Sequence, residues 1–243
     1  EVAEAFPGVV AEELIAGYGI LTVPENLVEP VLTRPEIEYV EIPKRLYFSD
    51  FQARNASCIL QVTEGYPNLT GQGVAVAIID SGIDYTLPHF RNADGSTRIL
   101  ALWDQGQSTS SQYPPPKGFS QGRLYTEEDI NSVLQGANDT EEEQGIGIGA
   151  FARLSEDTSG HGTAVAGIAA SSPVENYQGV APESSLVVVK LANTDRESFP
   201  RTTELMRALT FVTRFTAERR LPVSINLSFG NSYGSHNGGS ILE

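Results

Sequence analysis

The sequence predicts an α/β fold: a parallel sheet with helices on both faces, preceded by a small α+β module. Residues 74–79 (VAVAII) and 185–191 (SLVVVKL) are continuous apolar runs, which is the pattern of strands buried on both faces of a parallel sheet. A helix-like segment separates these runs, and a second helix-like segment and a third strand-like segment, at 222–230, follow them. Because parallel strands need crossover connections, this alternation predicts a sheet that helices cover on both sides.

The first 48 residues have a different pattern from the rest of the 243-residue chain. They offer two strands, around 19–23 and 37–42, and a helix at 26–32, which together predict a small α+β module at 1–48. A module of this size buries too little surface to be very stable alone, so we expect it to pack on the rest of the chain. A linker with a short helix is predicted to follow it.

The larger domain is predicted at 49–243, with an inserted lobe at 91–157. The lobe is polar and interrupted by proline and glycine, and its one predicted helix, at 126–134, has Thr126 and Asp129 at the spacing of an N-cap. The alternating glycines at 145–149 do not predict a phosphate loop, because no buried strand precedes them and no helix with a lysine follows. Beyond the lobe we expect a helix of small residues, 161–170, and an amphipathic helix, 202–220.

Charge and composition exclude several classes of protein. The chain has 31 acidic and 16 basic residues, a net charge of −15 and no cluster of lysine and arginine, so nucleic acid is not an expected partner. No apolar run approaches the roughly 18 residues of a membrane helix, so no membrane partner is expected either. The single cysteine, Cys58, excludes an intramolecular disulfide and a zinc site built from several cysteines.

Two polar residues stand where chemistry is expected. Asp80 ends the first buried strand, and catalytic groups gather at the carboxyl ends of parallel strands; the alternative is that Asp80 caps the following turn. His161 lies between two glycines, so nothing beside the imidazole crowds an incoming group. The alternatives for His161 are a buried structural histidine and a zinc site with His89 and His236, which the spacing of the three histidines does not favour. No metal site is therefore predicted.

Four segments together resemble the subtilisin-like serine proteases, in the right order and with the right element types between them. They are VAVAIIDSGID, SGHGTAVAGIAA, GVAPESSLVVVKL and SINLSFG. The resemblance implies a serine-type endopeptidase in which Asp80 is the orienting acid and His161 the general base of an Asp-His-Ser triad. It also implies that Ser228, Phe229 and Gly230 edge the substrate cleft and pair with the backbone of a polypeptide substrate.

The N-terminal module resembles the propeptide of the same family. The long insertion between Asp80 and His161 is similar to that of the germination-type, Csp-like subtilases of spore-forming bacteria. In the family the propeptide assists folding, lies across the cleft and is removed by self-cleavage, which implies a cut within 44–50. The analogy implies a secreted or spore- or envelope-associated protein. By the same analogy, the chemistry requires no cofactor. The family also has structural calcium sites, but the acidic residues of this sequence alone do not show where such a site would lie.

The sequence departs from the family pattern after Gly230. The family's nucleophile sits in a Gly-Thr-Ser-Met-Ala segment and its oxyanion asparagine in a Gly-Asn context, both well beyond the SINLSFG strand, and neither is found there. Ser240 lacks the residues that open the following helix, and Asn226 precedes the cleft segment. Three explanations are open: a truncated protease, a protease whose C-terminal remainder is a separate chain and partner, and a pseudoprotease that binds peptides without cleaving them. The intact Asp80 and His161 favour the first two.

Overall fold

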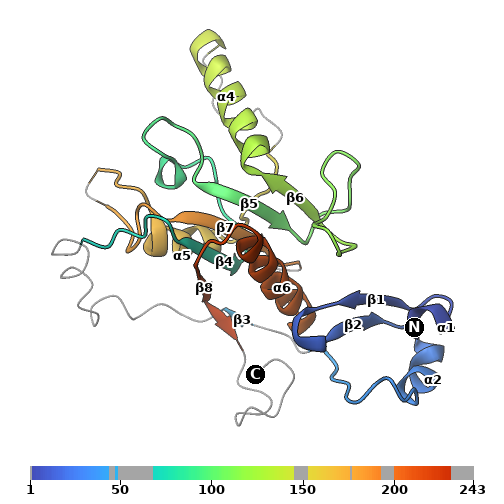
Figure 1. The fold of residues 1–243 in the computed structure, drawn as a ribbon. Helices are drawn as coiled ribbons and strands as arrows, with labels where there is room; N and C mark the ends of the chain where they lie inside the picture. The colour runs from blue at the N-terminus through green and yellow to red at the C-terminus, as the bar shows by residue number, and fades with distance from the viewer. Residues whose placement is uncertain are drawn as a thin grey trace.

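The computed structural model describes residues 2–43, 47–48, 68–144, 153–175, 177–192 and 200–230 (Figure 1). The predicted linker after residue 48, the glycines at 145–149 and Ser240 lie outside the described residues. Within the described ranges the chain forms an N-terminal module and a larger domain built on one central sheet (Figure 1).

Five strands form the central sheet, in the order β6-β5-β7-β4-β8. They are β4 (Ala75–Asp80), β5 (Ile99–Asp104), β6 (Arg123–Thr126), β7 (Ser185–Lys190) and β8 (Val223–Leu227). β4 pairs in parallel with β7 and β8, β5 pairs in parallel with β7, and β6 runs antiparallel to β5. The predicted α/β fold with a parallel sheet is therefore confirmed, with an antiparallel strand added at one edge.

The registers bring the carboxyl ends of the central strands to one level. Every residue of β4 is buried, and so are the four middle residues of β7, as continuous apolar runs require. Asp80 pairs with Lys190 at the end of β7. On the other side, Ile79 pairs with Leu227, so residues 228–230 continue just beyond the level of Asp80. The candidate cleft residues therefore follow the strand that lies next to Asp80.

Helices cover both faces of the sheet (Figure 1). On one face α6 (Thr202–Glu218) shares a hydrophobic cluster with the sheet, in which Leu205 and Val212 accompany Ala77. On the other face α5 (His161–Ala170) and α4 (Glu127–Gln144) belong to a second cluster, in which Val165 accompanies Ile78. Neighbouring residues of β4 thus serve opposite faces, because successive side chains of a strand point in opposite directions. The helices predicted at 161–170 and 202–220 are confirmed.

The expectation of a polar lobe at 91–157 is wrong for residues 99–104, which form β5 inside the main sheet. Five of the six residues of β5 are buried, so the run ILALWD belongs with the other apolar strands. A short 3-10 helix, η3 (Pro88–Phe90), precedes it. The predicted helix at 126–134 is present within α4, and its cap is confirmed: Thr126 N–H donates to Asp129 Oδ2 at 2.8 Å, and Asp129 N–H donates to Thr126 Oγ1 at 3.3 Å.

The N-terminal module is an antiparallel hairpin flanked by short helices. Its elements are α1 (Val2–Ala5), β1 (Val10–Glu13), η1 (Ile15–Gly17), β2 (Gly19–Thr22), η2 (Glu25–Leu27) and α2 (Val28–Leu32). The strand predicted around 19–23 and the helix predicted at 26–32 are confirmed. The strand predicted at 37–42 is wrong, because these residues join no ladder; Tyr39 and Ile42 are 62% and 82% exposed, so no sheet face buries their apolar side chains.

A buried ion pair joins the module to α6. Nε and Nη2 of Arg207 each donate to one carboxylate oxygen of Glu12 in β1, both at 2.8 Å, and each side chain is 6% exposed. Leu14 and Ile20 of the module are buried in the same hydrophobic cluster as α6. The module therefore packs on the larger domain, as its small size predicts.

Candidate active site

Asp80 and His161 are in direct contact at the carboxyl edge of the sheet. His161 Nδ1 lies 2.8 Å from Asp80 Oδ1, although 81 residues separate them in the chain. The Asp80 side chain is fully buried, whereas 22% of the His161 side chain is exposed. The structure thus brings the two predicted residues together, with the carboxylate shielded from water and the imidazole partly exposed, although its Nε2 atom is buried.

Burial and hydrogen bonding oppose each other at Asp80. Removal from water raises the pKa of the Asp80 carboxyl above its ordinary value, because desolvation outweighs the hydrogen bonds from His161 and from the Ser81 N–H. The Ser81 N–H donates to Oδ1 at 2.7 Å, and Oδ2 accepts no hydrogen bond from the described residues. A carboxylate in this position favours the His161 tautomer with the proton on Nδ1, because the Nδ1–H group is the strongest hydrogen-bond donor to the Asp80 carboxylate.

Two glycines place His161, but for different reasons. His161 is the first residue of α5, and Gly160 before it has a φ of 72°, in the left-handed region that glycine adopts without strain. Gly160 has open space around it, as the sequence suggests. Gly162, by contrast, is needed for close packing: a Cβ at this position would lie 2.2 Å from the carbonyl oxygen of Gly82. The start of α5 therefore packs directly on the loop that follows Asp80.

The candidate cleft residues Ser228, Phe229 and Gly230 follow β8 and lie beside a strand from the N-terminal part of the chain. β9 (Phe229–Gly230) pairs antiparallel with β3 (Tyr47–Phe48), with Tyr47 opposite Gly230 and Phe48 opposite Phe229 (Figure 1). The last two residues of the predicted 1–48 module thus bind backbone to backbone at the end of the strand next to Asp80. This is the kind of pairing that an extended peptide makes when it adds a strand to a sheet edge.

The sequence reasoning did not single out Ser81, Asp157 and Thr163, which surround the pair. The Asp157 carboxylate accepts hydrogen bonds from the hydroxyl groups of Ser81, at 2.7 Å, and Thr163, at 2.6 Å. It therefore links the segment of Asp80 to the segment of His161. The polar residues of the stretch DTSGHGT indicate that side chains could support His161. Asp, Ser and Thr beside glycine are also ordinary turn residues, so the sequence pattern alone does not distinguish residues that support the Asp80–His161 pair from residues that only form a turn.

A second buried carboxylate, Asp104, ends strand β5, which β7 separates from β4 in the sheet. It accepts hydrogen bonds from Ser155 Oγ at 2.6 Å, from Gly106 N–H at 2.9 Å and from Gln107 Nε2 at 3.1 Å, and it lies 3.7 Å from Lys190 Nζ. These contacts tie β5 to β7 and to the chain ahead of α5. Asp104 therefore resembles Asp157 in accepting several hydrogen bonds, but it is more deeply buried and serves a different part of the fold.

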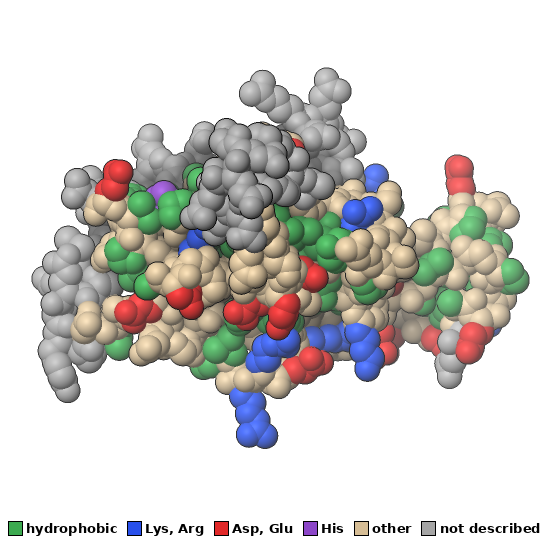
Figure 2. All heavy atoms as spheres, turned by 90° about the horizontal axis from the view of Figure 1, so that it is seen from above, with side chains coloured by type: hydrophobic (Ala, Val, Ile, Leu, Met, Phe, Trp, Pro, Cys, Tyr) green, Lys and Arg blue, Asp and Glu red, His purple; other side chains and the backbone are tan. Residues whose placement is uncertain are grey.

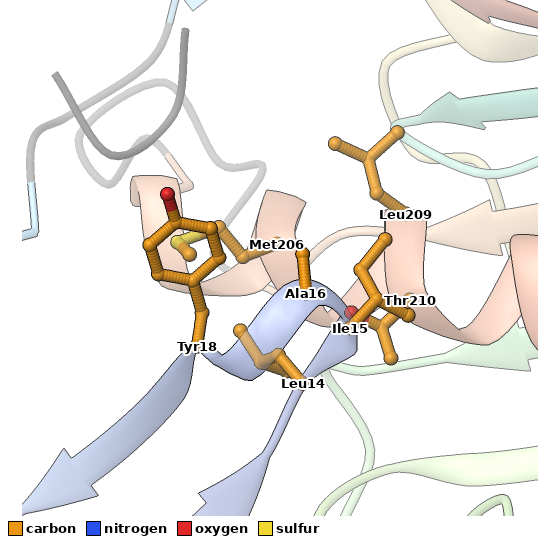
Figure 3. A pocket seen from close by; sticks show the side chains of 7 residues that line it. All are labelled: Leu14, Ile15, Ala16, Tyr18, Met206, Leu209 and Thr210. Atoms are coloured by element: carbon orange, nitrogen blue, oxygen red, sulfur yellow. The ribbon is translucent and has the colours of Figure 1, made fainter. Parts of the chain in front are cut away.

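An open apolar pocket lies where the N-terminal module meets α6 (Figure 3). The module contributes Leu14, Ile15, Ala16 and Tyr18, and α6 contributes Met206, Leu209 and Thr210. The pocket includes neither Asp80 nor His161, so it is a feature of the module contact and not the candidate active site.

The visible surface in Figure 2 carries acidic side chains at many places, with lysine and arginine between them. None of the helices in the described ranges has the length and apolar character of a membrane span. In the same part of the chain, no three His, Cys, Asp or Glu side chains gather in a way that could hold a metal ion.

A parallel α/β sheet with a buried carboxylate and an imidazole in contact at its carboxyl edge is the arrangement that the resemblance to subtilisin-like proteases implies, and the chain belongs to the subtilase family. The profile of the Subtilase family matches residues 71–241. A second profile, described as the Csp protease B prodomain, matches residues 1–44. The resemblance to subtilisin-like proteases with a Csp-like propeptide, which the sequence indicates, is confirmed.

Two relatives illustrate what the chain is similar to. The structure of the Clostridium perfringens CspB protease is 35% identical in sequence with a TM-score of 0.60, over 77% of this chain and 35% of that one. The PII-type proteinase of Lacticaseibacillus paracasei is 26% identical over 213 residues, which is 82% of this chain and 10% of that protein. The chain thus spans much less than the full length of either relative.

Proposed function

We propose that the full-length protein is a serine-type endopeptidase in which Asp80 is the orienting acid and His161 the general base. The observation that carries this proposal is the 2.8 Å contact between His161 Nδ1 and the buried Asp80 carboxylate. The nucleophilic serine and the oxyanion asparagine are proposed to come from sequence beyond this chain, which covers 35% of the CspB protease structure. With two of the three triad groups, the chain alone is expected to be inactive.

In the proposed reaction, His161 donates Nδ1–H to Asp80 and uses Nε2 to take the proton of the serine hydroxyl. As the serine oxygen attacks the carbonyl carbon of the peptide, the imidazole becomes a cation, and the Asp80 carboxylate stabilises it. His161 then gives this proton to the leaving amine nitrogen when the peptide bond breaks. Because Asp80 is out of water, its attraction for the imidazolium is stronger than it would be at the surface.

The substrate is proposed to be an extended polypeptide whose backbone pairs with Ser228, Phe229 and Gly230. The pairing of β9 with β3 supports this, because β9 accepts an antiparallel strand from outside the central sheet. A substrate would take the place of β3 by strand addition. The segment at 47–48 would therefore compete with a substrate for the same backbone groups.

The alternative is a pseudoprotease that binds peptides without cleaving them. The same strand pairing favours it, since backbone hydrogen bonding at β9 needs no nucleophile. The two proposals differ in one feature, a serine within reach of His161. A Gly-Thr-Ser segment in the downstream sequence would support the protease, and its absence there would support the pseudoprotease.

A fluorophosphonate probe, which labels activated serines, tests the proposed activity in the full-length protein. We expect labelling, and we expect His161→Ala to lower both labelling and peptide hydrolysis by orders of magnitude, because triad members act as a unit. An unchanged rate in the His161→Ala protein contradicts the triad assignment. Absence of labelling in the unsubstituted, folded protein favours the peptide-binding alternative.

The remaining proposals concern partners, location and ions. In the described sheet β8 is an outer strand that pairs with β4, and Leu227 is 42% exposed, which favours a further strand from the C-terminal remainder of the catalytic domain as a partner. A secreted or spore- or envelope-associated location is proposed by analogy. The chemistry requires no cofactor, and structural calcium is proposed without an assigned position.

A further inference from the structure

The Asp157 carboxylate accepts more hydrogen bonds than a turn residue needs. Its Oδ1 accepts from Ser81 Oγ at 2.7 Å, from Gly160 N–H at 3.1 Å and from Ser159 Oγ at 3.3 Å. Its Oδ2 accepts from the N–H and the hydroxyl of Thr163, at 2.8 and 2.6 Å. These partners lie on both sides of His161 and, through Ser81, directly after Asp80.

Two of the three hydroxyl groups that donate to Asp157, those of Ser81 and Thr163, also link the Asp80 loop to α5. Ser81 Oγ accepts a hydrogen bond from Gly162 N–H at 2.9 Å, and Thr163 Oγ1 accepts one from Asp84 N–H at 2.9 Å. A hydroxyl has one proton, and an ionised carboxylate can only accept. Asp157 therefore makes both hydroxyls donate to it, which turns their lone pairs towards the two backbone N–H groups.

An asparagine at this position would break that arrangement, because its amide offers one acceptor oxygen and one NH2 donor group. One of the two hydroxyls would then face a donor. The ionised form of Asp157 is favoured in the fold: burial alone would raise its pKa, but the hydrogen bonds from Thr163 and Ser81 together hold the pKa of the Asp157 carboxyl below its ordinary value.

We propose that Asp157 is a positioning residue that locks the start of α5 to the Asp80 loop, and so fixes the Nδ1-protonated tautomer of His161 against Asp80. This proposal rests on the proposed catalytic role of the pair. Asp157 acts through Ser81 and Thr163 and does not itself touch the reacting atoms.

The tautomer can be measured in this chain without any protease activity. Nitrogen-15 NMR distinguishes a protonated from an unprotonated ring nitrogen, and His161→Gln identifies the His161 signals among the three histidines. We expect a proton on Nδ1 in the unsubstituted chain at about pH 8, where an ordinary imidazole is neutral. We expect a mixture of the two tautomers in Asp157→Asn. An unchanged tautomer in a folded Asp157→Asn chain overturns the proposal.

Matched variants separate positioning from a general loss of packing. Thr163→Val keeps the shape of the side chain and removes the hydroxyl, so it should disturb the tautomer, whereas Thr163→Ser keeps the hydroxyl and should preserve it. Asp104→Asn removes a carboxylate that is more deeply buried than Asp157, at the end of β5, and should leave the His161 signals unchanged. If Asp157→Asn does not fold, the Thr163 pair decides: equal spectra for Val and Ser overturn the proposal.

In the full-length protein, Asp157→Asn should lower kcat by about 100-fold with little change in KM, since misplacement by about 1 Å costs rate on this scale. A loss confined to KM contradicts a positioning role. This assay also separates the two proposals: if His161→Ala leaves hydrolysis unchanged, the proposed function fails, while the tautomer measurement still tests the role of Asp157.

Discussion

At the scale of single residues, Asp80 is a fully buried carboxylate and Asp157 a partly buried one, and their pKa shifts make stability depend on pH in opposite directions. The pKa of Asp80 is raised by burial, so the folded state holds its proton more tightly than the unfolded state does. Its contribution to stability therefore decreases as the pH rises through the unfolded and then the folded pKa. The pKa of Asp157 is lowered, so its contribution is present at neutral pH and is lost as the pH falls through the folded pKa.

Asp80→Asn should raise the stability of this chain at about pH 8 and leave it nearly unchanged at about pH 3, where the carboxyl is protonated in both states. Thermal unfolding measures the effect, with roughly 2–4 °C expected for each kcal/mol in a chain of this size. Asp157→Asn is the matched comparison, and it should lower the unfolding temperature at about pH 8. A lower unfolding temperature for Asp80→Asn at about pH 8 contradicts the raised pKa.

Sequence reasoning at this scale found the two residues in contact but not the ones that hold them. Asp80 and His161 stood out because one ends a buried strand and the other lies in a glycine-rich stretch. Asp157 did not, because its role depends on five hydrogen bonds that reach as far as Ser81, 76 residues away. Such contacts exist only once β4 and α5 are packed together.

At the scale of elements, α5 depends on a close approach to the loop after β4. Gly162→Ala would place its Cβ 2.2 Å from the carbonyl oxygen of Gly82 and 3.1 Å from Asp80 Cβ. Backbone atoms cannot move aside as a flexible side chain can, so we expect this substitution to destabilise the fold by about 1–3 kcal/mol, as overpacking does. Chemical denaturation of the chain measures the change.

Gly167→Ala is the matched control in the same helix. Its Cβ would meet only the Tyr177 hydroxyl, at 3.8 Å, which is an ordinary contact. Because alanine is favoured over glycine in a helix by about 1 kcal/mol, Gly167→Ala should be neutral or stabilising. Equal effects of the two substitutions would show that the packing of α5 on the Asp80 loop does not limit stability.

The contact between the hairpin of the N-terminal module and α6 depends on the ion pair between Glu12 and Arg207. Glu12→Gln removes the bidentate partner of the buried Arg207 guanidinium and leaves Glu204, 3.6 Å from Nη1, as its remaining carboxylate, so the cost should stay below the about 3–5 kcal/mol of a buried charge left wholly unpaired. Faster hydrogen exchange in residues 10–22 should report the loss. Arg34→Gln is the control, because the Arg34–Glu36 pair is about one-third exposed and should contribute little.

Replacing both partners of the buried pair tests the cause. A Glu12→Met, Arg207→Met double variant, made together with Glu204→Gln because Glu204 also contacts Arg207, removes all three charges and should recover most of the protection in residues 10–22, since an apolar pair avoids the cost of burying an unpaired charge. If hydrogen exchange in residues 10–22 is as fast in this combined variant as in Glu12→Gln, the attraction between the charges stabilises the contact by more than the free energy that their burial costs.

Elements were predictable where the apolar pattern was continuous. β4 and β7 are such runs, whereas β5 has the same character but was assigned to the polar lobe because proline and glycine surround it. The sequence does not predict β1, because only one of its four residues is buried and its apolar pattern is therefore weak. The segment at 37–42 misled in the opposite direction, since its apolar residues alternate like those of a strand yet remain exposed.

At the scale of the whole molecule, self-processing can be tested by mass spectrometry. In the full-length protein we expect a cut within 44–50, a range that contains the segment that pairs with β9, and we expect this chain alone to stay uncut because it lacks the proposed nucleophile. Changing the downstream serine to Ala should leave the full-length protein uncut as well. Identical, uncut N-termini in both full-length proteins would refute self-processing and favour the pseudoprotease.

The ion pair between Glu12 and Arg207 also has a consequence for biosynthesis. The two residues are 195 positions apart, so the module leaves the ribosome long before the helix on which it packs. At about 5–20 residues per second, the interval is roughly 10–40 s. During that time Leu14 and Ile20 have no α6 to cover them, although both are buried in the finished fold. The nascent chain therefore passes through a period in which the N-terminal module exposes apolar surface, and this period ends when α6 is made and packs on it.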